Sequence, residues 1–570
     1  MNILLSLIIF INVIYTNSLN NPTVKTPLGK ISGRVRKSFN GREYQVFEGV
    51  PYAQVPVGAL RFQPPQPVTP WQGTIVATRP QSSCLQYNHL PLNPPERVEG
   101  SEDCLYLNIY SPAKNGNKKL LPVIFYIHGG AFQFGTAFHT GVHYIMDRDL
   151  LVVTINYRLG PFGFLSTGDS VVPGNMGLKD QNMALAWVSK NIQHFGGDPN
   201  KITLAGLSAG GASVHYHYLS PLSRGLFHGG MSFSGTALDC WTQTENAPEK
   251  AKKLGEILGC PTSDNISLVK CLTTRPAVNI AQAVGDFMPW LYNPYTPFGP
   301  VVEKESKKPF IDRSPAEIIS SGDAADVPWL TSLTSEEGLY PAAEFVNDPK
   351  LMSELDTKWD EIAPHLLDFN YTIAPNRHVE VAEKIRKHYL GNKKINKSHA
   401  MEIIHLVGDR LFAVDGEKAA RMMAKAKRGP VWFYYFTYTG PYSLSDEFIP
   451  SHEHFGVSHG DDVFLVLRTT KGGIVTDESA LKVQNKLMDM WESMAKNGTP
   501  NFGIHWKNVD PYKEALEYLH IAGVDKIYMD ENKNLGEKNF WAEINFDENK
   551  LESESCSSSS ASVDKSHTEF

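Results

Sequence analysis

The chain has 570 residues, of which 42% are hydrophobic and 20% are charged, a balance from which a large globular core can be built. Its net charge of -7 and the lack of a stripe of lysine and arginine exclude a nucleic-acid-binding function, which needs clustered positive charge. Beyond the N-terminal segment, no stretch is long and apolar enough to span a membrane, which takes ~20 residues.

The chain begins with an apolar run over residues 3–13. The run is too short to cross a bilayer, and the small residues Thr16 and Ser18 that follow it predict a signal peptide over residues 1–18. No Lys or Arg precedes the run, and the alternative is a buried N-terminal strand or helix. A signal peptide implies a secreted protein in an oxidising compartment, where cysteines form pairs.

Cysteines and sequons fit this compartment. Composition alone leaves several pairings open among the six cysteines, which are Cys84, Cys104, Cys240, Cys260, Cys271 and Cys556. Four Asn-x-Ser/Thr sequons predict a glycoprotein, with candidate acceptors Asn265, Asn370, Asn396 and Asn497.

The first part of the predicted domain, residues 29–73, mixes short β-type runs with turn residues and predicts antiparallel hairpins at a sheet edge. Continuous apolar runs follow at residues 105–110, 120–127 and 150–157. Such runs are typical of strands that are covered on both faces. Residues 177–195 carry apolar positions at helical spacing and predict a helix.

The second half continues the alternation of strands and helices. A strand at residues 201–205 leads into a helix of small residues, and further strands are predicted at 229–233, 327–333, 431–437 and 516–521, with a late helix at 478–495. This order predicts an α/β fold, with a large, mostly parallel central sheet and helices on both faces. We expect one domain over residues 19–546, and an acidic, Ser-rich, disordered tail over residues 547–570.

Two Gly-x-Ser-x-Gly motifs compete for the role of nucleophile: Gly206-Leu-Ser208-Ala-Gly210 and Gly456-Val-Ser458-His-Gly460. The chemistry needs a sharp strand-to-helix turn, with glycines where a Cβ would collide with neighbouring backbone. Ser208 lies between a predicted strand and a predicted helix, whereas no strand precedes Ser458. The pattern therefore predicts Ser208 as the nucleophile of a serine hydrolase with the α/β-hydrolase fold, in which the nucleophile occupies a turn of this kind.

A serine nucleophile of this kind requires an oxyanion hole. His128-Gly-Gly-Ala131 directly follows the buried strand that ends at Ile127, and its small residues leave backbone N–H groups accessible. The predicted donors are the N–H groups of Gly130, Ala131 and Ala209.

The acid and the base are less determined by pattern. In this fold the chain order is Ser, acid, His, and His459 lies late in the chain in a Gly-flanked loop, with His452 and His454 as rivals. Glu336 and Glu337 follow a predicted strand, and the pattern does not decide which carboxylate points inward.

Taken together, these segments resemble the type-B carboxylesterases, the family of cholinesterases, liver carboxylesterases and insect esterases. The resemblance covers residues 26–541 and rests on Glu48-Gly-Val-Pro-Tyr-Ala, Leu60-Arg-Phe-Gln-Pro-Pro, Ser101-Glu-Asp-Cys-Leu-Tyr-Leu-Asn, Phe195-Gly-Gly-Asp-Pro and the segment around Ser208. It implies ester hydrolysis through a Ser208–His459–Glu337 triad without metal or cofactor, and a supporting role for Ser234. It also implies the disulfides Cys84–Cys104 and Cys260–Cys271, with Cys240 and Cys556 unpaired or variable.

Departures from the family narrow the expected substrate. Cholinesterases bind a quaternary ammonium on a Trp in the first disulfide loop, and residues 85–103 contain only Tyr87 as an aromatic side chain. The resemblance is therefore closest to insect carboxylesterases, and we expect a preference for neutral, apolar, small-molecule esters. The alternatives are a juvenile hormone esterase, although Leu207 replaces the usual Gln, and a catalytically inert adhesion protein of the same fold family.

The last four residues, His567-Thr-Glu-Phe570, resemble the His-x-Glu-Leu tails that retain liver carboxylesterases in the ER, but they end in Phe. Secretion is the expected localisation, and the ER lumen is the alternative.

Overall fold

The computed structural model of the chain describes residues 21–90, 96–112, 119–448, 455–469 and 474–550. Several predictions concern residues outside these ranges: the signal peptide over residues 1–18, the rival histidines His452 and His454, Cys556, and the tail at 567–570.

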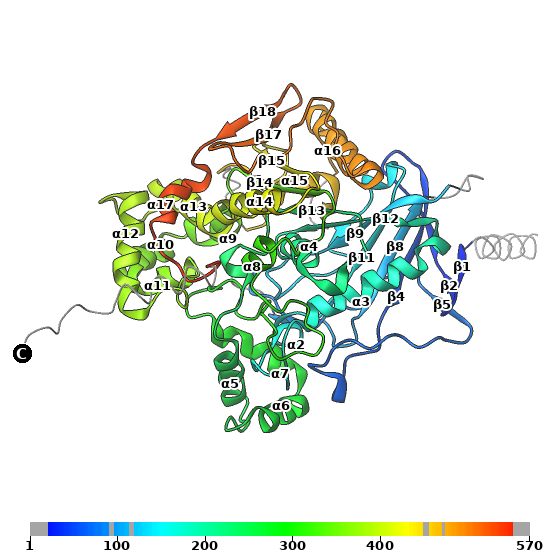
Figure 1. Cartoon of the computed structure of the whole chain (residues 1–570), viewed down its shortest axis with the longest axis horizontal. Helices are drawn as coiled ribbons and strands as arrows, with labels where there is room; N and C mark the ends of the chain where they lie inside the picture. The colour runs from blue at the N-terminus through cyan, green and yellow to red at the C-terminus, as the bar shows by residue number, and fades with distance from the viewer. Residues whose placement is uncertain (1–20, 91–95, 113–118, 449–454, 470–473, 551–570) are drawn as a thin grey trace, which may run out of the picture.

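The centre of the molecule is an eleven-stranded sheet with the order β18-β17-β15-β14-β13-β12-β9-β11-β8-β4-β3 (Figure 1). Its strands from β11 to β17 run parallel, whereas those at the two edges are antiparallel to their neighbours. The parallel strands are β9 (Leu121–Ile127), β11 (Leu151–Ile155), β12 (Gly197–Leu207), β13 (Gly229–Phe233), β14 (Trp329–Thr334), β15 (Val431–Phe436) and β17 (Leu516–Gly523). The edge strands are β3 (Arg34–Lys37), β4 (Glu43–Pro51), β8 (Tyr106–Pro112) and β18 (Lys526–Asn532).

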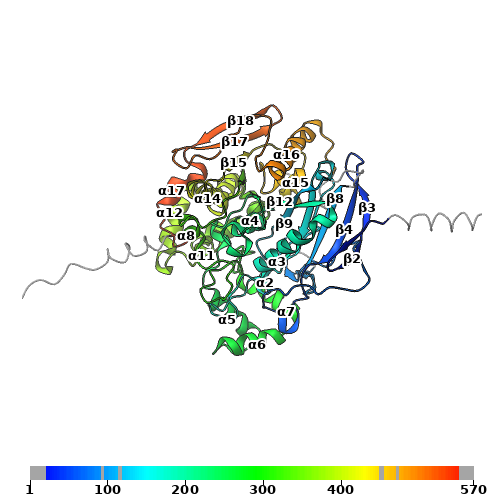
Figure 2. The same ribbon diagram turned by 45° about the vertical axis from the view of Figure 1, so that its right-hand side comes forward.

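Both faces of this sheet are buried. Successive side chains of a strand point to opposite faces, so one strand contributes to the hydrophobic core on each side. In β9, Val123 and Phe125 join one hydrophobic core, and Ile124 and Tyr126 join the other. The first core includes side chains of α3 (Met176–Asn191) and α4 (Ala209–Leu219), and the second includes side chains of α16 (Glu478–Asn497). Figure 2 shows α3 and α16 on either side of the strands. The predicted fold class, a mostly parallel sheet covered by helices on both faces, is confirmed.

Most helices and strands match their predicted positions. The helix expected at 177–195 is α3 followed by a short 3-10 turn (Ile192–Phe195), and the helix expected at 478–495 is α16. The predicted N-terminal hairpins form two separate structures. One is the β3–β4 edge, and the other is a three-stranded sheet of β1 (Thr23–Thr26), β2 (Gly29–Ser32) and β5 (Thr74–Val76).

A helical region lies between β14 and β15, at the left of Figure 1. Its main helices are α9 (Leu339–Val346), α10 (Pro349–Thr357), α11 (Trp359–Leu366), α12 (His378–Leu390), α13 (Ala400–Gly408) and α14 (Val414–Ala426). A π-helical turn, Asp409–Ala413, joins α13 to α14. None of the described helices is long and apolar enough to cross a bilayer.

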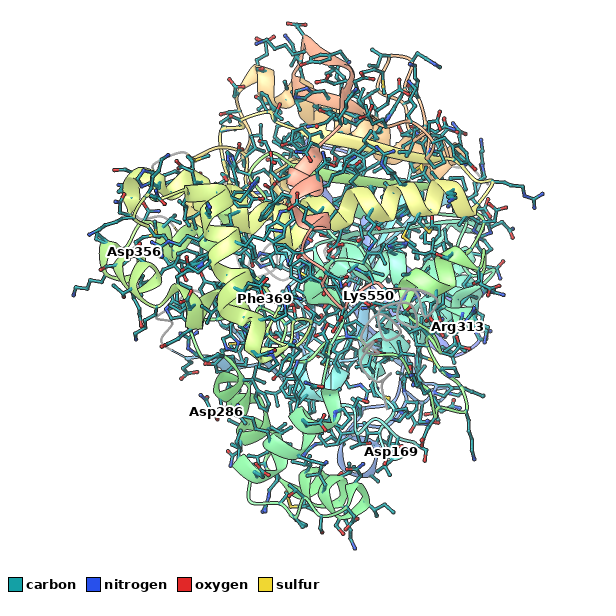
Figure 3. All side chains as sticks on the ribbon, turned by 60° about the vertical axis from the view of Figure 1, so that its left-hand side comes forward. Asp169, Asp286, Arg313, Asp356, Phe369 and Lys550 are labelled. Carbon is teal, nitrogen blue, oxygen red and sulfur yellow. A yellow bond between two sulfur atoms is a disulfide. The ribbon has the colours of Figure 1, made fainter. Side chains whose placement is uncertain are left out.

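The start of the predicted disordered tail is part of the folded structure. We expected disorder from residue 547, yet the side chain of Glu548 is only 5% exposed and pairs with the buried Arg410. The backbone N–H of Asp547 donates to Thr372. The acidic composition did not predict this order, because it cannot show that the Glu548 carboxylate pairs with a buried arginine. Figure 3 labels Lys550, the last described residue, near the middle of the view.

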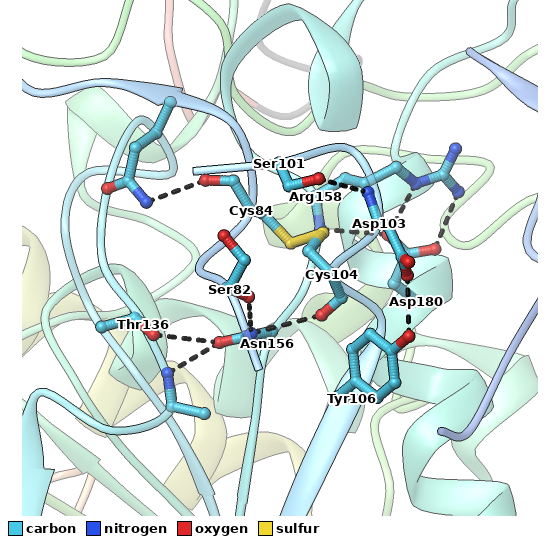
Figure 4. The surroundings of a disulfide bond; sticks show 12 residues. Ser82, Cys84, Ser101, Asp103, Cys104, Tyr106, Thr136, Asn156, Arg158 and Asp180 are labelled. Atoms are coloured by element: carbon cyan, nitrogen blue, oxygen red, sulfur yellow. Dashed lines mark hydrogen bonds and ion pairs between the residues drawn. A yellow bond between two sulfur atoms is a disulfide. The ribbon is translucent and has the colours of Figure 1, made fainter. Parts of the chain in front are cut away.

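Two disulfides close short loops, with the pairing that the family resemblance implies: Cys84–Cys104 and Cys260–Cys271, whose Cα atoms are 4.9 Å and 5.7 Å apart. Asn156 braces the first one by donating to the carbonyls of Cys104, at 3.2 Å, and Ser82, at 3.0 Å (Figure 4). Cys240 is a buried free thiol, and burial raises its pKa well above the usual value.

Candidate active site

Ser208 occupies the sharp turn between β12 and α4. Its φ of 61° and ψ of -126° are rare for a residue with a side chain, and such strain is typical of functional sites. Two glycines permit the turn: a Cβ on Gly206 would lie 2.3 Å from the Gly210 carbonyl, and one on Gly210 would lie 2.1 Å from the Ile127 oxygen. Only glycine fits at either position, so the motif spacing follows from close backbone packing.

The loop after β9 approaches this turn closely. A Cβ on Gly129 would lie 3.0 Å from the Cβ of Ser208, and Gly130 and Ala131 both have positive φ, at 106° and 52°. Within the described part of the chain, the N–H groups of Gly130 and Ala131 donate to no acceptor. Ala209 is the first residue of α4, where backbone N–H groups have no partner within the helix. The three predicted oxyanion-hole residues therefore offer free donors next to Ser208.

His128, which begins this loop, has a supporting position. Its ring stacks on Tyr157 with centroids 4.4 Å apart, and its backbone carbonyl accepts a hydrogen bond from the Tyr157 hydroxyl at 3.0 Å. Burial lowers the pKa of His128 to about 4, so the ring is neutral at physiological pH. It anchors the glycine loop as an uncharged side chain.

Glu337 and His459 form a buried pair, with Oε2 of Glu337 2.6 Å from Nδ1 of His459. The other carboxylate oxygen accepts from the Ser234 hydroxyl, at 2.6 Å, and from the backbone N–H of Thr334, at 2.7 Å. Each donor fixes the carboxylate, and an ionised carboxylate can accept all three bonds. Since the carboxylate binds Nδ1–H, Nε2 of His459 is the nitrogen that can accept a proton.

Glu336 points elsewhere. Its Oε2 accepts from the backbone N–H of Val457 at 2.6 Å, and its own N–H donates to the Val457 carbonyl at 3.0 Å. A Cβ on Gly456 would lie 2.3 Å from the Glu336 carboxylate, so the glycine makes room for it. Glu336 thus braces the loop that carries His459.

Ser208 and His459 share their neighbours. A small pocket is lined by Ala131, Ser208, Trp241, Tyr295, Tyr340, Pro341, Leu411 and Phe412. The His459 ring lies 5.3 Å from the Tyr340 ring and 4.7 Å from the Phe412 ring, centroid to centroid. Nε2 of His459 is buried and has no hydrogen-bond partner among the described residues. Ser208 and Ala131 therefore line one mostly apolar pocket together with Tyr340 and Phe412, the two residues whose rings contact His459.

A second buried carboxylate lies behind the pair. Asp462 accepts from the Tyr434 hydroxyl at 2.5 Å and from the Val463 N–H at 2.8 Å. Burial raises the pKa of Asp462 to about 6, the Tyr434 hydrogen bond opposes this, and the charge of Glu337 adds to it. Two carboxylates close together in a buried region disfavour ionising both.

The competing serine lies outside the pocket lining. Ser458 is fully buried in the loop before α15 (Asp461–Val466), and its N–H donates to Asp461 at 2.8 Å. The described residues directly before it, 455–457, form no strand, and Ser458 itself forms an isolated bridge with Glu336. It lacks the strand-to-helix turn that Ser208 has.

Sequence reasoning missed most of the pocket wall. Trp241 lines the pocket, whereas the apolar residues near it in the chain, such as Phe233 and Leu238, pack in the core. Tyr340 was within reach of pattern, because it lies three residues after Glu337. Leu411 and Phe412 were not, since they belong to the π-helical turn of a region without any motif.

The sequons differ in accessibility. Asn396 and Asn497 are exposed, whereas Asn265 and Asn370 are partly buried. The amide of Asn265 donates to Asp169 at 2.9 Å, so it is already engaged.

Comparisons with known proteins agree with this geometry. A family profile described as "Carboxylesterase family" matches residues 20–541. The chain is 52% identical over 532 residues to venom carboxylesterase-6 of Apis mellifera, covering 93% of this chain and 95% of the relative. It is 50% identical over 554 residues to a carboxylic ester hydrolase of Bombus ignitus, covering 96% and 98%. The crystal structure of juvenile hormone esterase from Manduca sexta, with OTFP covalently attached, superposes with a TM-score of 0.81 at 28% identity, covering 92% of this chain and 99% of that one.

Proposed function

The chain belongs to the carboxylesterase family and is a carboxylic ester hydrolase, and from that premise we propose that Ser208, His459 and Glu337 carry out its reaction. The observation that carries this proposal is the Glu337–His459 pair, whose free Nε2 lies next to the pocket that holds Ser208.

In the first half-reaction, the Ser208 hydroxyl attacks the ester carbonyl while Nε2 of His459 takes its proton. Glu337 holds the imidazole through Nδ1 and stabilises the imidazolium that forms. The N–H groups of Gly130, Ala131 and Ala209 stabilise the negative charge on the carbonyl oxygen. His459 then protonates the leaving alcohol, and water repeats the sequence on the acyl-enzyme, so that the acid leaves and Ser208 is restored.

Active-site labelling tests this assignment. An organophosphate should attach to Ser208 alone, and Ser208→Ala should lower kcat by ~10⁶ while Ser458→Ala labels and turns over normally. Attachment at Ser458 would transfer the nucleophile to the second motif. An inert adhesion protein, the alternative from another class, would show neither labelling nor turnover.

We further propose that the substrate is a neutral, apolar ester. The pocket wall is aromatic and aliphatic, with Trp241, Tyr340 and Phe412 among its residues, and none of the described residues that line it is a carboxylate. A wall of this kind favours the binding of apolar groups and provides no anionic partner for a cationic substrate. Juvenile hormone remains the second candidate substrate, because the solved structure quoted above is that of a juvenile hormone esterase.

Secretion is the proposed localisation. The apolar N-terminal segment, the two disulfides and the relative named a venom carboxylesterase support it. We expect Asn396 and Asn497 to carry glycans before Asn265 and Asn370, since they are the exposed acceptors. Expression with the native leader should place a chain beginning near Leu19 in the medium. A sharp increase after deletion of His567–Phe570 would instead identify an ER-retention signal.

A further inference from the structure

Two chain segments supply one wall of the catalytic pocket. The π-helical turn Asp409–Ala413 contributes Leu411 and Phe412, and the short 3-10 turn Cys240–Thr242 contributes Trp241. The indole N–H of Trp241 donates to the Leu411 carbonyl at 2.7 Å, so the two segments are joined inside the wall. Phe412 also contacts the ring of His459. Any shift of these segments changes the shape of the space beside Ser208.

The C-terminal segment holds the first of them from behind. Arg410, next to Leu411, is 4% exposed, and its guanidinium donates to Glu548 at 2.7 Å and to the Leu367 carbonyl at 3.0 Å. The guanidinium also lies 3.9 Å from the centroid of the Phe546 ring. Phe546 in turn contacts Phe369, which Figure 3 labels on the same side of the molecule as Lys550. A buried arginine needs such partners, so Glu548 fixes where residue 410 lies.

The next residue holds the second segment. The amide of Asn549 donates to the Leu238 carbonyl at 2.6 Å and accepts from the Gln243 side chain at 2.9 Å. Leu238 and Gln243 flank Trp241 in the chain. Asn549 has a φ of 59°, a left-handed conformation that asparagine tolerates better than most residues. Two adjacent residues, Glu548 and Asn549, thus reach both segments of the wall.

We propose that residues 546–549, here called the strap, position this pocket wall and thereby limit the size of the ester that the enzyme accepts. This inference rests on the proposed reaction at Ser208. Glu548 and Asn549 are positioning residues: their contacts are with Arg410, Leu238 and Gln243, and none of these three lines the pocket. Without the strap, the wall gains freedom to move outward, and a longer acyl chain enters at less cost.

The test compares two esters with the same leaving group, p-nitrophenyl acetate and p-nitrophenyl hexanoate, on the full-length protein. Enzyme concentration is set by organophosphate titration, so that lost or unfolded protein does not count. Because both esters meet the same titrated sites, a purely structural defect leaves the ratio of their kcat/KM values unchanged. We expect Asn549→Ala to raise the hexanoate-to-acetate ratio by at least ~5-fold, a change of the size that pocket fit produces.

Three further variants sharpen the result. Glu548→Ala should move the ratio in the same direction, and if it does not fold, Asn549→Ala decides alone. Glu548→Gln keeps an acceptor for Arg410 and should stay within ~2-fold of wild type. Lys550→Ala is the matched control, since the Lys550 ammonium pairs with Asp547 and, within the described chain, forms no hydrogen bond or ion pair with either wall segment. An unchanged ratio in Asn549→Ala, or an equal shift in Lys550→Ala, overturns the strap. Failure of the wild type to hydrolyse either ester would instead refute the proposed function.

Discussion

Glu336 and Glu337 are adjacent in the chain, and their carboxylates bind the loop that carries His459 at two different points. Glu337 meets the Nδ1 of His459 at 2.6 Å, and Glu336 meets the backbone N–H of Val457 at 2.6 Å. One carboxylate contacts the imidazole itself, and the other sets the path of the backbone that carries it. The same charge at neighbouring positions therefore has different consequences when it is removed.

Glu337→Gln should lower kcat/KM by ~10³ to 10⁴, because the imidazolium loses its anionic partner and the wrong tautomer of His459 is favoured. Steady-state kinetics on a p-nitrophenyl ester measures the loss. Glu336→Gln is the matched control: it keeps an oxygen to accept from Val457 and should stay within a few-fold of wild type. Equal losses in both variants would contradict the assignment of the acid.

Ser234→Ala removes one of the donors to Glu337. A hydrogen bond to a charged group contributes ~1.5–3 kcal/mol, so we expect kcat/KM to fall by about one to two orders of magnitude with the nucleophile still labelled by organophosphate. Ser232→Ala, two residues earlier in β13, removes a buried hydroxyl that bonds Gly211 and Trp329 instead. Its activity per titrated site should remain near wild type; a comparable drop there would mean that packing, and not Glu337, explains the effect.

Asp462 should make stability depend on pH. Its pKa is raised to about 6 by burial and by Glu337, against ~3.9 for an exposed aspartate. The folded protein then holds a proton that the unfolded chain has lost, so the free energy of unfolding decreases as the pH rises from about 4 to about 6. Asp462→Asn should match wild type near pH 4 and exceed it by ~3 kcal/mol near pH 7.

Thermal unfolding at a series of pH values checks this prediction for Asp462→Asn. The control is Asp525→Asn, at an exposed position, which should shift the melting temperature equally at every pH. A variant of Asp462 that is less stable than wild type at pH 7 would contradict a raised pKa.

The loop closed by Cys84 and Cys104 should stabilise the fold by limiting the unfolded chain. Loop-closure entropy for a loop of this length is worth ~3 kcal/mol, so the double variant Cys84→Ser with Cys104→Ser should melt several degrees lower. Non-reducing peptide mapping should recover two disulfide-linked pairs, Cys84–Cys104 and Cys260–Cys271. Cys240 should be recovered as a free thiol. A bond from Cys240 to Cys260 or Cys271 would refute the pairing.

Substrate preference can be measured side by side. Naphthyl acetate and naphthyl butyrate should give a kcat/KM far above that of acetylcholine, because the part of the lining that the structure describes has no carboxylate to offset the desolvation of a quaternary ammonium. Juvenile hormone belongs in the same series. A preference for acetylcholine would refute the proposal of neutral esters, and tight, efficient cleavage of juvenile hormone would make that hormone the better candidate.

Sequence predicts the features of this protein that depend on residues close together in the chain, and it fails for those that depend on distant segments. The turn at Ser208 was predictable, because Gly206 and Gly210 are required by contacts within a few residues and the neighbouring strand. The buried strands were predictable from continuous apolar runs. Local pattern did not predict which of Glu336 and Glu337 contacts His459, since that depends on a loop more than a hundred residues later, and the expectation of Glu337 rested on the family resemblance. The ordered start of the tail was also missed, because its partner Arg410 lies 138 residues away in the chain.

The three proposed catalytic residues follow three different strands of one sheet: Ser208 follows β12, Glu337 follows β14, and His459 comes after β15. No fragment of the chain contains a working site, because the strands must first align in the correct order and register. Turnover is therefore a reporter of complete folding, more stringent than secondary-structure content. During refolding from denaturant, organophosphate titration would count only molecules in which the whole centre of the sheet has assembled, and partly folded intermediates would remain invisible to it.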